Sequence, residues 1–141
     1  MSVSSGEPRI VANLEYVRQL IAAFLAGDLD KCFALMDPRV EFDNRTGAPG
    51  LEGTYVGREE ILDMLVKLNE AFEGYRVEPL RFEGGEEQVA VLQREVGRGR
   101  ASGLEVDQRT VFLCTLTDGK VSRIEAFPDP RGDLREVLRL G

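Results

Sequence analysis

Two segments in the second half of the chain, 88–96 and 104–117, alternate between apolar and polar residues. Successive side chains of a strand point to opposite faces, so each segment would present one row of side chains to a common side. The polar and aromatic members of these rows are Gln93, Glu95, Gln108, Thr110 and Phe112. Desolvation in an apolar cavity disfavours the charged form of a carboxyl group and so raises its pKa. A raised pKa suits the group to general acid or base catalysis. We therefore predict that Glu95 transfers protons.

Three amide side chains accompany this carboxylate. Asn44 ends the short segment Val40–Asn44, and it joins Gln93 and Gln108 as a group that would orient water or a substrate. The alternative is that Glu95 faces solvent beside neighbouring arginines in a splayed hairpin. The orientation of Glu95 therefore decides whether this set forms a site.

A second carboxylate, Asp43, stands near the end of the same short segment. Arg45 lies two residues away. We expect a surface ion pair there, in preference to a second catalytic base.

The composition limits the chemistry that is available. The chain has no histidine, which is the usual proton shuttle at neutral pH, so a reaction would rely on carboxylates, tyrosines, amides or thiols. No cluster of cysteines and carboxylates has the spacing of metal ligands, and no glycine-rich strand-to-helix turn indicates a nucleotide. We expect neither a metal nor a cofactor.

Length and charge indicate one domain that avoids anionic partners. A chain of 141 residues has the usual size of a single domain, and its net charge of -7 opposes nucleic-acid phosphates and anionic membranes. No apolar run has the length of a membrane span, and no signal peptide is indicated. Cys32 and Cys114 fall among apolar residues, as buried reduced thiols do. We expect a cytoplasmic protein with no nucleic-acid or membrane partner.

Helical patterns fill the start of the chain. Apolar residues recur at helical steps over 10–24, and Gly27 is of the type preferred after a helix C-terminus. A short second helix is predicted from Leu29 until Pro38 stops it, and the strand 40–44 follows. The pattern predicts two helices that lead directly into a strand.

Glycine and proline residues punctuate the next segment. The stretch 45–56 carries many such residues, so we predict a loop that lies at a cavity mouth and acts as a lid. A third helix is predicted from Gly57 to Phe72. We place the domain at 9–141 and interpret residues 1–8 as a flexible leader.

The rest of the chain has the period-two pattern of strands. The predicted strands are 75–83, 88–96, 104–117 and 120–127. Asp118-Gly119 is a two-residue hairpin signal, because both central residues of such a turn need a positive φ. Helices followed by strands indicate an α+β fold, with an antiparallel meander curled over the helices. Leu134, Val137 and Leu138 suggest a final short helix.

The outer face of this sheet is only partly polar. Glu105, Asp107 and Arg109 would face solvent or form a dimer rim, whereas Val111 and Leu113 continue the same row. A half-apolar outer face often pairs with a second copy of itself, and we predict a homodimer.

Four motifs in this order carry a family resemblance. They are Ala26-Gly27-Asp28-Leu29-Asp30, Val40-Glu41-Phe42-Asp43-Asn44, Tyr55-Val56-Gly57-Arg58-Glu59 and Leu116-Thr117-Asp118-Gly119-Lys120-Val121. The pattern resembles the SnoaL-like and limonene epoxide hydrolase-like branches of the nuclear transport factor 2-like superfamily. The resemblance implies a cone-shaped mixed sheet wrapped around N-terminal helices, a scaffold that hosts enzymes and non-catalytic binding domains alike.

The epoxide hydrolase pattern is only half matched. Those enzymes hold a water with a tyrosine, an asparagine and an aspartate, while a second aspartate donates a proton and an arginine joins the acids. Asn44 matches the asparagine and Glu95 replaces the first aspartate, but Phe42, Gln93 and Ala126 stand at the tyrosine, arginine and acid positions. Epoxide hydrolysis is therefore the lesser expectation.

The resemblance to ketosteroid isomerases is similarly incomplete. Leu20 stands at the helical tyrosine position, and Val111 or Phe112 stands at the late-strand acid, so the oxyanion donors of that family are missing. Tyr16 lies one turn before Leu20 and could reach the pocket mouth, although packing against the core is the simpler explanation. In the N-terminal segment, Leu20, Phe24 and Phe42 would supply an apolar wall.

The resemblance to polyketide cyclases remains, with a lone carboxylate in an aromatic-lined cavity. We predict cofactor-free acid/base chemistry by Glu95, with Asn44, on a polyketide- or terpenoid-like molecule. The alternative is a non-catalytic ligand-binding or dimerisation module. The residues expected to line the substrate site are Tyr16, Leu20, Phe24, Phe42, Gln93, Gln108, Thr110, Phe112 and Ala126.

Overall fold

The computed structural model describes residues 7–46, 50–129 and 137–138. The helices are α1 (Glu7–Leu25), α2 (Leu29–Ala34) and α3 (Gly57–Ala71). The strands are β1 (Met36–Asn44), β2 (Gly53–Val56), β3 (Phe72–Gly84), β4 (Gln88–Gly99), β5 (Glu105–Thr117) and β6 (Lys120–Pro128).

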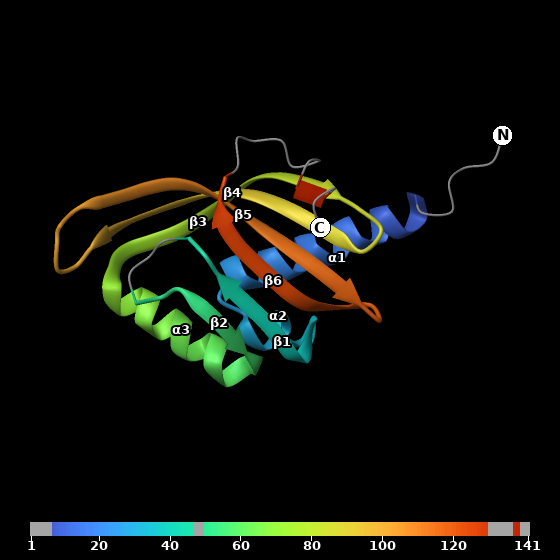
Figure 1. Cartoon of the computed structure of the whole chain (residues 1–141), viewed down its shortest axis with the longest axis horizontal. Helices are drawn as coiled ribbons and strands as arrows, with labels where there is room; N and C mark the ends of the chain where they lie inside the picture. Colours follow the sequence, from blue (N-terminus) through green and yellow to red (C-terminus); the bar gives the residue numbers. More distant parts are fainter. Residues whose placement is uncertain (1–6, 47–49, 130–136, 139–141) are drawn as a thin grey trace.

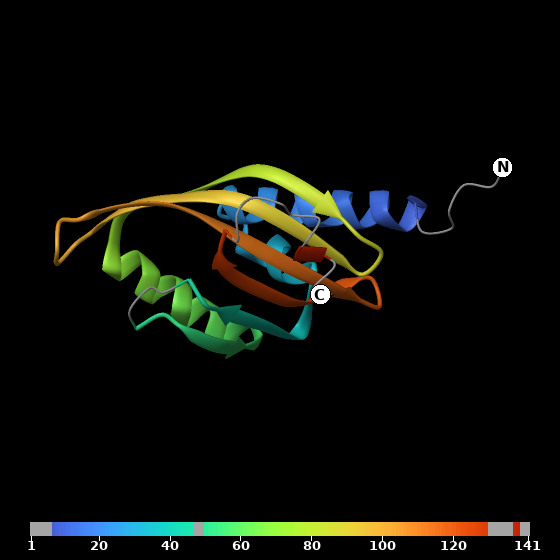
Figure 2. The same ribbon diagram turned by 45° about the horizontal axis from the view of Figure 1, so that its top comes forward.

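The six strands form one sheet in the order β2-β1-β6-β5-β4-β3. β1 and β6 are parallel, and the other neighbouring pairs are antiparallel. The sheet curves around α1 and α2, and α3 lies along β1 and β2 (Figures 1 and 2). This confirms the predicted α+β class with a curved mixed sheet and N-terminal helices.

The meander β3 to β6 follows the predicted strand order. Its last turn has positive φ at both central residues, 52° at Asp118 and 79° at Gly119, as the sequence pair predicts. Alternation then gives each strand a face toward the helices. On β4 that face carries Val89, Val91 and Glu95, while Ala90 and Leu92 face outward.

The main core lies between the concave face of the sheet and the helices. Val17, Leu20 and Ile21 of α1 are buried there, because their spacing places them on one side of the helix. Cys32 and Cys114 are buried free thiols in the same core, as predicted. Burial raises the pKa of Cys32 to about 11 and that of Cys114 to about 12.

The boundary between α2 and β1 differs from the prediction. The helix ends at Ala34 and the strand begins at Met36, so Pro38 lies within β1 and does not end the helix. Proline has no N–H for a ladder, and the pairing of β1 with β6 is irregular between Met36 and Glu41. The irregularity accommodates Pro38.

Two other boundaries were predicted wrongly. α1 begins at Glu7, because a first helical turn tolerates Pro8. Gly53–Val56 is a strand paired with β1, not part of a loop, because its β-branched and aromatic residues suit an edge strand. The remainder of the predicted lid includes residues 47–49, which lie outside the described residues.

The apolar outer face is covered by the chain itself. Val111 and Leu113 are buried in a second cluster with Ala90, Leu92 and Val137, and Leu138 and Phe127 pack against it. Val137 and Leu138 are helical, whereas Leu134 lies outside the described residues. The observation that motivated a homodimer is thus partly explained within one chain, and the homodimer stays a prediction.

Within the described ranges, no helix has both the length and the apolarity needed to cross a membrane.

Candidate functional site

A pocket opens between the concave face of the sheet and the three helices. Its unfilled volume is about 100 Å³. Most of the wall is apolar and comes from α1, α2, α3 and the inner rows of β1, β3, β5 and β6. The apolar and aromatic lining residues include Leu20, Ile21, Phe24, Phe33, Phe42, Ile61, Met64, Leu65, Leu68, Phe72, Phe112, Ile124 and Ala126.

Glu95 brings a carboxylate into this apolar wall. It lines the pocket and is only 6% exposed, so the alternative of a solvent-facing Glu95 is wrong. Its Oε1 atom accepts hydrogen bonds from Tyr75 at 3.1 Å and from Gln93 Nε2 at 3.4 Å. Its Oε2 atom accepts one from Gln108 Nε2 at 3.2 Å. All three neighbours donate, which is the arrangement that suits a carboxylate.

Tyr75 is the neighbour that sequence reasoning missed. In the register of β3 and β4, Val77 pairs with Glu95, so Tyr75 lies two residues away on the same face. Gly97 is opposite, where an added Cβ would lie 3.4 Å from Tyr75 Cα and 3.6 Å from its ring. The glycine therefore leaves room for the ring. The pairing of β3 with β4 in a hairpin could have indicated that Tyr75 lies near Glu95. A register irregularity between Glu73 and Arg76 obscures this relation in the sequence.

The environment of Tyr75 keeps its hydroxyl protonated. Burial raises the pKa of Tyr75 strongly, and the negative charge of Glu95 and the hydrogen bond to it raise this pKa further. The hydroxyl thus remains a donor across the neutral range.

Asn44 lines the pocket but does not bond to Glu95 among the described residues. Its Oδ1 atom accepts from the backbone N–H and the hydroxyl of Thr46, at 3.2 and 2.8 Å. Its Nδ2 atom has a weak contact with Met64 Sδ at 3.9 Å. Asn44 therefore retains donor capacity that faces an otherwise apolar region, and its catalytic role stays a prediction.

Six other predicted residues line the pocket. They are Leu20, Phe24, Phe42, Gln108, Phe112 and Ala126. Phe42 and Phe112 meet edge to face, with ring centroids 5.6 Å apart and an interplanar angle of 84°. These rings form a rigid part of the wall.

Three predicted binding residues do not line the pocket. The Tyr16 hydroxyl donates to the Leu35 carbonyl oxygen at 2.8 Å, so this tyrosine is held in the core and not at a pocket mouth. Gln93 and Thr110 are fully buried, and Gln93 supports Glu95 from behind the wall. Within the described part of the chain, Gln93 Oε1 and Thr110 Oγ1 lack hydrogen-bond partners. The prediction that Gln93 and Thr110 point to the inner face of the sheet was correct, but the pocket does not extend to them.

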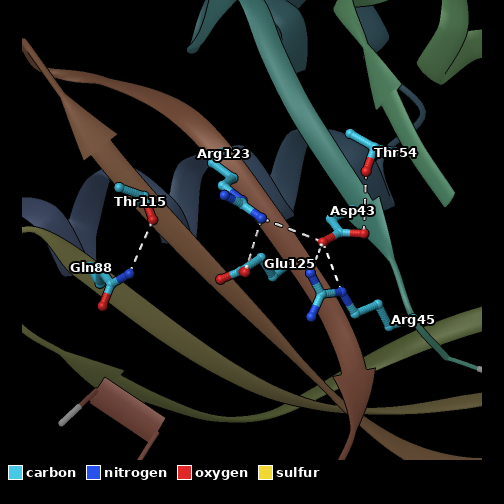
Figure 3. A network of polar contacts seen from close by, with 7 residues as sticks. All are labelled: Asp43, Arg45, Thr54, Gln88, Thr115, Arg123 and Glu125. Carbon is cyan, nitrogen blue, oxygen red and sulfur yellow. Dashed lines mark hydrogen bonds and ion pairs between the residues drawn. The ribbon is translucent and has the colours of Figure 1, made fainter. Parts of the chain in front are cut away.

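The opposite face of the sheet holds a separate polar network (Figure 3). Asp43 Oδ2 lies 2.6 Å from Arg45 Nη2 and 3.4 Å from Arg123 Nη2. Arg123 also pairs with Glu125 at 3.2 Å, and Thr54 donates to Asp43 at 3.5 Å. The predicted pair of Asp43 with Arg45 is confirmed, but the carboxylate is buried, not on the surface.

The charge environment of Asp43 differs from a catalytic one. The hydrogen bond from Arg45 lowers the pKa of Asp43 below its usual value, and the charges of Arg45 and Arg123 add to this against the opposing effect of burial. Elsewhere in the described ranges, no group of three or more cysteines and carboxylates is arranged to hold a metal ion.

Comparisons with known proteins place this chain in a family. A family model described as a SnoaL-like domain matches residues 17–124. An uncharacterised protein from Mycobacterium tuberculosis is 30% identical over 122 residues, which cover 84% of this chain and 91% of that protein.

Solved structures agree on the fold. TerC, co-crystallised with polyporic acid, is 25% identical with a TM-score of 0.73, covering 92% of this chain and 97% of TerC. A nuclear transport factor 2-like protein of unknown function from Burkholderia pseudomallei is 24% identical with a TM-score of 0.74, covering 92% and 96% of the two chains. The chain therefore belongs to the SnoaL-like domain family, and it shares the nuclear transport factor 2-like fold.

Proposed function

We propose that this protein binds an apolar small molecule in the pocket and carries out cofactor-free acid/base chemistry on it through Glu95. The observation that carries the proposal is a buried carboxylate in an apolar wall, oriented by the three donors Tyr75, Gln93 and Gln108. Side chains that are fixed in this way need little rearrangement when a substrate arrives.

The proposed step is a proton transfer. Glu95 takes a proton from an acidic C–H or O–H bond of the substrate, and the electron pair of that bond moves into an adjacent carbonyl group. Asn44 Nδ2 is the pocket donor that we assign to stabilise the resulting oxygen anion, because its one acceptor among the described residues is the sulfur of Met64. Return of the proton to another carbon completes an isomerisation. In a cyclisation, the carbanion carbon first bonds to a second carbonyl carbon of the substrate, and the oxygen of that carbonyl then takes the proton from Glu95. Neither route needs an oxidant.

The size of the pocket bears on the substrate. Ligand pockets usually have about 300–1,000 Å³, and the unfilled volume here is about 100 Å³. A polyketide- or terpenoid-like molecule would therefore require flexible side chains such as Met64 and Leu68 to move. That TerC was co-crystallised with polyporic acid supports ligand binding by a relative of this fold.

A non-catalytic binding protein is the second candidate. It is favoured by the absence, among described residues, of a hydrogen bond between Asn44 and Glu95. Epoxide hydrolysis has less support, because Ala126 lines the pocket where that family has its proton donor.

The exchange of α-protons of cyclohexanone for deuterium, followed by NMR, separates the two candidates without a known substrate. We expect the protein to accelerate this exchange and Glu95→Gln to lower the acceleration by about a hundredfold. Glu78→Gln is the matched control, because it removes the same charge from a side chain that is 61% exposed on the outer face. Equal exchange rates for the protein and Glu95→Gln would exclude catalysis by Glu95, and the non-catalytic binding function would remain.

A further inference from the structure

The pocket contains a buried carboxylate but no matching positive charge. Among the described residues that line it, Glu95 is the one acidic carboxyl group, and none is lysine or arginine. The chain has no histidine. The neighbours that bond to Glu95 are a tyrosine and two glutamines, all of them neutral donors.

Several other carboxylates in this protein are paired with arginine. Asp43 has Arg45 and Arg123, although it is as buried as Glu95. Arg94, which precedes Glu95 in the chain, points to the outer face and binds Asp107 there at 2.7 Å. The chain therefore has arginines close by in sequence, and the structure directs them away from the pocket.

An unpaired buried ion has a substantial desolvation cost, and a ligand of opposite charge offsets part of it. The lining also contains six aromatic residues, namely Phe24, Phe33, Phe42, Phe72, Tyr75 and Phe112. Aromatic faces attract organic cations, and a trimethylammonium group is the size of ligand that such rings enclose. Carboxylate and rings thus favour the same kind of ligand.

We propose that the pocket selects hydrophobic organic cations, such as tertiary or quaternary amines, with the nitrogen near Glu95 and the carbon substituents against the aromatic wall. The inference rests on the proposed function only in using the same pocket. It also excludes carboxylate ligands, since a second anion beside Glu95 would be repelled in a region of low dielectric constant.

Three probes of similar size test charge selection. They are choline, its uncharged isostere with a tert-butyl group in place of trimethylammonium, and the anion tert-butylacetate. NMR titration of backbone amides measures the dissociation constant of each. We expect choline to bind roughly tenfold or more tightly than the uncharged isostere, and we expect no binding of the anion. A quaternary nitrogen has no proton to transfer, so this result does not depend on catalysis.

Variants assign the selectivity to the carboxylate. Glu95→Gln should make choline and its isostere bind equally, whereas Glu78→Gln, on the outer face, should preserve the preference for choline. Thermal unfolding checks that each variant is folded. Equal binding of choline and its isostere by the unmodified protein would overturn the inference and leave the proposed pocket intact. If none of the three probes binds, the inference also fails, and the deuterium-exchange experiment decides the proposed function separately.

Discussion

Asp43 and Glu95 are two carboxylates of nearly equal burial, 5% and 6% exposed, on opposite faces of one sheet. Asp43 contacts two arginines (Figure 3), whereas Glu95 accepts hydrogen bonds from neutral groups. Equal burial therefore does not mean an equal environment. Arginine neutralises Asp43, whereas Glu95 has only neutral donors, which is what the proposed roles in proton transfer and cation binding require.

The largest effect on stability is expected at Asp43. Asp43→Ala removes the shared partner of Arg45 and Arg123 and the acceptor of the Thr54 hydroxyl. We expect the free energy of unfolding to fall by about 2–3 kcal/mol, measured by urea denaturation. The cyclohexanone exchange rate of the folded protein should be unchanged. A fall in that rate comparable to the fall in Glu95→Gln would show that the two faces are coupled.

Glu95→Gln should have the opposite effects, a large loss of the exchange rate and a small change in stability. It removes a buried charge that has no cationic partner, so the free energy of unfolding should change by about 1 kcal/mol or less. The same urea experiment measures it. A loss as large as that of Asp43→Ala would mean that Glu95 holds the fold together and would remove the contrast between the two acids.

Acidic pH provides a further test of the Asp43 ion pairs. The pKa of Asp43 is lowered in the folded protein, chiefly by the hydrogen bond from Arg45. Its stabilising contribution is therefore present above the unfolded pKa, near 3.8, and is lost as the pH falls through the folded value. Urea denaturation from neutral to acidic pH should show a steeper loss in the protein than in Asp43→Asn. Parallel curves would contradict the pairing.

The smallest effect is expected in alkali, at Tyr75. Its pKa is raised in the fold by burial and then by Glu95, above the ordinary value of 10.0. The unfolded chain therefore ionises first, and stability should fall as the pH rises above that value. Tyr75→Phe should lessen this alkaline loss, and Glu95→Gln should lessen it only in part, because burial is the larger cause. Circular dichroism against pH measures both.

The sequence predicted the elements whose patterns are local. The Asp118-Gly119 turn needs only its own two residues, and the alternation that places Glu95 inward needs only one strand. The edge strand Gly53–Val56 was missed, because four residues among glycines carry too little periodicity. Its strand character depends on pairing with β1, which is a tertiary contact.

The contents of the site were harder to predict than its location. Tyr75 reaches Glu95 only in the observed register of β3 and β4, which contains two irregularities that no local pattern reveals. Gln93 and Thr110 share the inward face as predicted, yet they lie behind the wall and not in it. The side of the sheet to which a side chain points follows from the alternation of its own strand. Whether that side chain reaches the pocket depends on how the helices pack over the sheet.

The parallel pairing of β1 with β6 determines when the pocket can exist. Phe42 and Asn44 of β1 lie beside Ile124 and Ala126 of β6, and all four line the cavity. Contacts between residues so distant in sequence form late and slowly, because a long loop must close first. During synthesis, the N-terminal helices and β1 emerge well before their partner strand. The binding wall should therefore be among the last parts of the domain to assemble, and a chain interrupted before β6 should lack it.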